Sequence, residues 1–110
     1  MKKLLNIDGK EIILSSNGAA PIIYKKEFKR DFFSDIVKLA DQDNFDFEVV
    51  YNFFYVFAKI GNKDIADFED FFSQFDNFGI GDYVADVVEI ATSCISTQNN
   101  IKNIVAAVNN

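Results

Sequence analysis

One segment constrains the fold of this 110-residue chain more than any other, because residues 46–60 are apolar around almost the whole circumference of a helix. Two apolar stripes run side by side along the segment at helical spacing, which leaves one narrow polar line. That line consists of Glu48, Asn52, Tyr55 and Lys59. A helix with so little polar surface must be buried on several sides. We therefore expect 46–60 to be either the central helix of a domain or part of a subunit interface.

The first fifteen residues predict a β-hairpin. Apolar-rich runs at 4–7 and 11–14 flank Asp8-Gly9, which is a strong signal for a two-residue turn. Two strands alone are only marginally stable, so the hairpin must pack on something helical.

Helical spacing of apolar residues recurs from residue 19 to the end of the chain. Gly61-Asn62 is expected to end the helix over 46–60 as a C-cap. The sequence thus predicts a mainly α fold, in which one domain (1–110) has an N-terminal β-hairpin (1–15) and a helical body (19–110) of five or six helices. The predicted helix starts are marked by a proline or a capping side chain, namely Pro21, Asp31, Asp46, Asp67, Asp82 and Thr97.

The charge of the chain is unevenly distributed. Its net charge is −6, yet residues 1–30 alone sum to +4 and residues 31–110 to −10. An acidic body disfavours nucleic-acid binding, because basic contacts with phosphate supply most non-specific affinity. The basic start could meet an acidic partner or the acidic body of a neighbouring copy, although such asymmetry is more often a solvated surface.

The chain also lacks the signals of membrane insertion and secretion. No apolar run approaches the roughly 20 residues that a membrane span needs, and no apolar stretch of a signal peptide follows the lysines at the N-terminus. A single cysteine, Cys94, allows no intramolecular disulfide and fits a reducing compartment. We expect a cytoplasmic protein without membrane partners.

Catalytic chemistry is not expected either. The chain has no histidine, which excludes triads and metal sites that depend on imidazole. Cys94 lies among apolar residues and is interpreted as a small core residue. We predict no enzyme activity, no metal and no cofactor.

Carboxylates at helical spacing are the remaining catalytic candidates. They form two lines, Asp67 with Asp70, and Asp82 with Asp86 and Glu89. Each line lies opposite an apolar face, where solvated acids belong, so we interpret both as surface residues.

One apolar face has a possible functional meaning. Its ordinary interpretation is an amphipathic helix that packs on the core. The alternative is the wall of a groove that accepts an apolar helix of a partner. The candidate contacts are Phe68, Phe71, Phe72 and Phe75 on the face, and Phe78 just beyond it.

Most of the chain resembles a known family. The matching stretches are Ile-Asp-Gly-Lys at 7–10, residues 17–20 and 23–31, Tyr-Val-Phe-Ala-Lys at 55–59, the Phe-rich residues 65–76, and an acidic-aliphatic helix over 82–96. In length, order and spacing this pattern resembles the short tail assembly chaperones encoded by long-tailed phages and prophages of Gram-positive bacteria.

The resemblance implies a binding protein in the cytoplasm of the host cell. Such chaperones coat the helical tape measure protein, keep it soluble until the tail tube polymerises around it, and leave before the virion is complete. It also implies the tail tube protein, a longer frameshifted form and further copies of the chain as candidate partners. The alternative hypothesis, which rests on the −10 balance of residues 31–110, is an acidic phage regulator or nucleic-acid mimic that binds a basic host protein.

Overall fold

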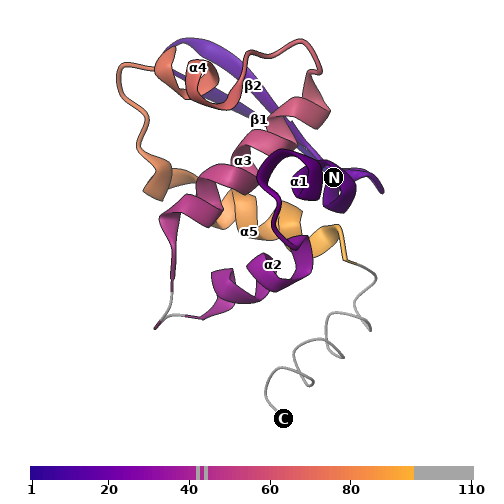
Figure 1. Cartoon of the computed structure of the whole chain (residues 1–110). Coiled ribbons are helices and arrows are strands. Elements are labelled where there is room, and N and C mark those ends of the chain that lie inside the picture. The colour runs from indigo at the N-terminus through magenta and orange to yellow at the C-terminus, as the bar shows by residue number, and fades with distance from the viewer. Residues whose placement is uncertain (42, 44, 96–110) are drawn as a thin grey trace.

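The computed structural model describes residues 1–41, 43 and 45–95 and confirms a mainly α fold with an N-terminal hairpin (Figure 1). The predicted helix that begins at Thr97 lies outside the described residues. The elements in chain order are β1 (Lys2–Ile7), β2 (Lys10–Ser15), α1 (Ala20–Phe28), α2 (Phe32–Ala40), α3 (Phe47–Gly61), α4 (Phe68–Ser73), the 3₁₀ helix η1 (Ile80–Tyr83) and α5 (Val84–Ser93).

The hairpin forms around the predicted turn. β1 and β2 pair antiparallel, with Ile7 opposite Lys10 next to the turn. Asp8 and Gly9 both have positive φ, +56° and +78°. Positive φ at both central residues is the requirement of the turn whose twist matches that of the two strands, and Asp and Gly tolerate it best.

Two of the predicted caps are confirmed and two are wrong. Asp31 accepts a hydrogen bond from the Ser34 backbone N–H at 2.8 Å, and Asp46 accepts one from the backbone N–H two residues on at 2.9 Å. Asp67 precedes α4 as predicted, but its side chain makes no capping hydrogen bond. Asp82 does not start α5, because its N–H bonds to the Gly79 carbonyl and it is taken into η1, which places the start at Val84.

Helix α3 is the central helix of the domain. It passes through the middle of the molecule, with α4 and the hairpin towards one end and α2 towards the other (Figure 1). Its residues from Val49 to Ala58 are buried, apart from Tyr51. The predicted polar line is wrong in its middle, since Asn52 and Tyr55 are only 4% and 3% exposed. The Tyr55 hydroxyl donates to the Ala66 carbonyl at 3.0 Å, which satisfies it in the interior.

The end of α3 lies where predicted, but it is not the predicted glycine C-cap. Neither Gly61 nor Asn62 has the positive φ of a glycine C-cap. Gly61 instead lies against β2, where a Cβ would be 2.2 Å from the Ile13 carbonyl oxygen and 2.9 Å from its carbon. The glycine is required because the helix backbone approaches the strand backbone too closely for any side chain.

A buried carboxylate that the sequence analysis did not single out joins α1 to α2. The Asp35 side chain is 3% exposed and accepts hydrogen bonds from the Tyr24 hydroxyl at 2.6 Å and from Arg30 at 2.7 and 2.9 Å. Burial would raise the pKa of Asp35, but the hydrogen bonds from Arg30 and Tyr24 outweigh it and leave that pKa below its ordinary value. Burial and the bond to Asp35 raise the pKa of the Tyr24 hydroxyl. The carboxylate is therefore ionised in the fold and holds the two helices together.

Candidate functional site

The structure divides the predicted phenylalanine face into two groups. Phe71 and Phe75 belong to the core, with 1% and 7% of their surface exposed. Phe68, Phe72 and Phe78 are half-buried and pack against that core with part of each ring accessible. The ordinary interpretation of an amphipathic helix thus holds for the first pair, and only the second group can contact a partner.

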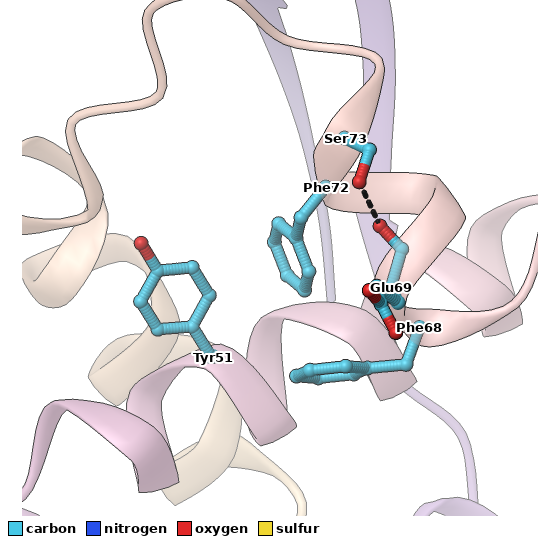
Figure 2. A pocket seen from close by; sticks show the side chains of 5 residues that line it. All are labelled: Tyr51, Phe68, Glu69, Phe72 and Ser73. Carbon is cyan, nitrogen blue, oxygen red and sulfur yellow. Dashed lines mark hydrogen bonds between the residues drawn. The ribbon is translucent and has the colours of Figure 1, made fainter.

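Phe68 and Phe72 form one side of a shallow surface hollow of about 460 Å³, which we call the aromatic hollow. Tyr51 of α3 faces them, and the backbone and side chains of Glu69 and Ser73 complete the lining (Figure 2). The Phe72 ring lies edge-on to Tyr51, with centroids 4.9 Å apart, and edge-on to Phe68 at 5.1 Å. Tyr51 is not predicted as a site residue by the sequence, because it is 17 positions from Phe68 and shares no local pattern with it.

Phe78 contacts two of the aromatic residues that line the hollow. Its ring lies 5.8 Å from Tyr51, 5.2 Å from Phe72 and 5.1 Å from the buried Phe54. The contacts with Phe72 and Phe54 are edge-to-face, and contacts of that kind contribute about 0.5–1.5 kcal/mol each beyond the area that they bury. The walls of the hollow are therefore continuous with the aromatic core and are fixed by it.

Helix α4 is short, and polar contacts hold the chain on both sides of it. Before the helix, the Tyr55 hydroxyl binds the Ala66 carbonyl. After the helix, the turn of the hairpin holds the chain, because the Asp8 carboxylate accepts hydrogen bonds from the backbone N–H groups of Asp76 and Asn77 at 2.7 and 3.3 Å. Lys10 donates to the Gln74 carbonyl at 2.8 Å. The packing of β2 on α3 confirms that the hairpin packs on a helical element. The turn between β1 and β2 in addition holds the chain just after α4.

A second hollow of about 530 Å³ adjoins the first and shares Phe68 and Glu69 with it. We call it the acidic hollow. Its one ammonium group, Lys59, forms a salt bridge with Glu27, and that hydrogen bond raises the pKa of Lys59. The remaining carboxylates form no salt bridge within the described part of the chain. They are Asp67, Glu69 and Asp70.

The other carboxylate line, interpreted from the sequence as surface residues, forms salt bridges through two of its three members, Asp86 and Glu89. Lys3 of β1 lies 3.0 Å from Asp86 and 2.7 Å from Glu89, so the two acids are held by one ammonium group. Hydrogen bonds from Lys3 to both acids raise the pKa of the lysine, which keeps it charged. In residues 1–41, 43 and 45–95 no three His, Cys, Asp or Glu side chains gather as metal ligands would.

Cys94 lies half-buried near the end of α5. Burial raises the pKa of its thiol, with smaller opposing effects of hydrogen bonds from Ser16 and Ser93. A thiol with a raised pKa is a poor nucleophile at neutral pH, which agrees with its interpretation as a packing residue.

Comparison of the chain with protein-family models, with curated proteins and with solved structures gives no match. Within the described part of the chain, no helix has the length and apolar character that a membrane crossing requires.

Proposed function

We propose that the protein is a tail assembly chaperone of a long-tailed phage or prophage, which binds the tape measure protein and keeps it soluble during tail assembly. The observation that carries this proposal is the aromatic hollow of Tyr51, Phe68 and Phe72, an accessible apolar site on a fixed scaffold. The resemblance supports it, because the family-like stretch 65–76 contains α4 and so builds one wall of that hollow.

The chemistry of the hollow suits a helical client. A tape measure protein is a long helix whose apolar stripe is unprotected before assembly, and such a stripe aggregates in water. Apolar side chains at i, i+3 and i+4 of a client helix can enter a shallow aromatic surface without matching a deep pocket. Shallow binding of this kind is readily reversible, which fits a chaperone that leaves before the virion is complete.

The remaining partners belong to the same proposal. The tail tube protein, a longer frameshifted form and further copies of the chain would meet the protein during assembly in the host cytoplasm. No catalytic step, cofactor or metal is part of this role.

Co-expression with a tape measure fragment tests the proposal. We expect the wild-type protein to move the fragment from the insoluble to the soluble fraction and to co-purify with it. Ser73→Trp should abolish both effects, because the indole would fill the aromatic hollow from the exposed end of α4. The matched control is Ala85→Trp, which adds the same ring at an exposed position of α5 outside the hollow. Unchanged solubility with the wild-type protein would refute the proposal.

The acidic hollow favours a second candidate, an acidic regulator that occupies a basic surface of a host protein. The observation that supports this function is its three carboxylates that form no salt bridge with any described residue. Exposed charges are screened within about 8 Å at physiological salt, so binding through them would weaken steeply as salt is added. A pull-down from phage-producing cells at low and high salt separates the two functions, since an apolar client would stay bound at high salt.

A further inference from the structure

The two hollows are one continuous surface with two kinds of chemistry. Phe68 and Glu69 line both of them, so the aromatic hollow ends where the acidic hollow begins. One side of this boundary offers the rings of Tyr51 and Phe72, and the other offers carboxylates. A helix that lies across the boundary would meet apolar surface along one turn and negative charge along the next.

The acidic side has more negative charge than the described part of the chain neutralises. It contains four carboxylates against the single ammonium group of Lys59, which is already bound to Glu27. Three of these carboxylates lie within four positions of the chain and are exposed, namely Asp67, Glu69 and Asp70. Like charges this close repel one another, and a cation brought between them would relieve that repulsion.

The ordinary role of these acids accounts for part of the pattern only. Acidic residues in the first turn favour a helix through its dipole, which applies to Glu69 and Asp70 of α4. Asp67 makes no capping hydrogen bond, and its side chain lines the acidic hollow. The helix dipole favours all three acids, but it leaves them exposed and without a salt bridge within residues 1–41, 43 and 45–95.

We infer that this surface selects amphipathic helices whose apolar stripe is followed, about one turn along, by Lys or Arg. The apolar residues of such a helix lie in the aromatic hollow, and its basic residues lie against Asp67, Glu69 and Asp70. That the client is helical is taken from the proposed function, and the basic charge of the client is the new part of the inference. Complementary charge at the edge of an apolar contact sets specificity and association rate more than affinity. Selection would confine the chaperone to basic stretches of a client and exclude acidic helices with the same apolar stripe.

Two designed peptides test the inference with the full-length protein. Both carry the same Leu and Phe stripe on a 20-residue helix, but one has Lys and the other Glu at the flanking positions. Each exposed charge pair changes affinity by roughly 1.5- to 5-fold. With one pair for each of the three carboxylates, we therefore expect the Lys peptide to bind roughly 3- to 100-fold more tightly in fluorescence anisotropy at low salt. The difference should shrink as salt is added.

A pair of triple variants locates the selection. Replacing Asp67, Glu69 and Asp70 by their amides should remove the preference for the Lys peptide, and thermal unfolding checks that the variant is folded. The control replaces three exposed acids that line neither hollow, Glu11, Asp43 and Asp82, by amides and should keep the preference. Equal loss in both variants would overturn the inference, because net charge alone would then be responsible.

The remaining outcomes separate this inference from the proposed function. Equal binding of both peptides by the wild-type protein, or binding of neither, would overturn the inference whatever the tape measure experiment gives. A clear preference for the Lys peptide without any effect on tape measure solubility would keep the inference and refute the chaperone function.

Discussion

Replacing Gly61 by alanine probes the contact that joins the central helix to the hairpin. A Cβ at this position would lie 2.2 Å from the Ile13 carbonyl oxygen, 2.9 Å from the carbonyl carbon and 3.0 Å from the Ile13 Cγ2. Two of these atoms belong to the backbone of β2, which is paired along its length with β1. The added methyl group therefore cannot be accommodated by a side-chain rotation, and either α3 or the hairpin must move.

The sign of the effect follows from two opposing contributions. Alanine favours a helix over glycine by up to about 1 kcal/mol. Inserting a methyl group into a packed contact costs about 1–3 kcal/mol, and the rigid backbone neighbour places this site at the upper end. We expect Gly61→Ala to lower the free energy of unfolding by about 2 kcal/mol, the difference between about 3 and about 1.

Urea denaturation followed by circular dichroism measures the change, and a thermal scan should show a Tm lower by about 8 °C or more. Gly18→Ala and Gly81→Ala are matched controls, because a Cβ at either position meets no heavy atom within 4 Å. Both controls should be neutral or stabilised by up to about 1 kcal/mol, since alanine restricts the unfolded chain. A Gly61→Ala protein as stable as these controls would refute the argument that the Ile13 contact fixes the end of α3.

Two further predictions concern polar contacts. Asp8→Gly keeps the positive φ of the turn but removes the acceptor of two backbone N–H groups. We expect the free energy of unfolding to fall by about 1–2 kcal/mol and the amides of Asp76 and Asn77 to exchange faster. Unchanged exchange at both amides would contradict the proposed role of the turn. The pKa of Asp35 is lower in the folded than in the unfolded protein, so its stabilisation is complete above its unfolded pKa of about 3.9 and is lost as pH falls through the lower folded value. Urea denaturation between pH 7 and pH 2 should therefore show that the wild type loses stability more steeply below about pH 4 than Asp35→Asn does. Parallel plots of unfolding free energy against pH for the two proteins would count against an ionised Asp35 paired with Arg30.

The sequence predicts the local features of this fold well. Turn chemistry at Asp8-Gly9, the caps Asp31 and Asp46, and the burial of α3 are all confirmed. Each of them depends on residues within a few positions of one another, whose preferences are set by backbone sterics and helix periodicity.

Contacts between distant segments could not be predicted in the same way. Residue 61 must be glycine because Ile13, on another element, lies against it. The Asp35 carboxylate accepts a hydrogen bond from Tyr24, which its helical spacing indicates only as an apolar residue. The sequence placed five phenylalanines together but could not tell core from surface among them. Phe71 and Phe72 are adjacent, yet only the second lines a hollow, because the wall opposite it is Tyr51 of α3.

The hairpin contacts both elements between which the aromatic hollow lies. The aromatic hollow lies between α3, which carries Tyr51, and α4, which carries Phe68 and Phe72. β2 is packed against the end of α3 at Gly61, while the turn between β1 and β2 binds the chain just after α4. The same hairpin thus contacts both elements that carry the walls, although none of its residues lines the hollow. Substitutions at either hairpin contact should therefore weaken peptide binding as well as stability. Asp35→Asn removes a carboxylate that lines neither hollow, so it should lower stability while the folded protein still binds the peptide.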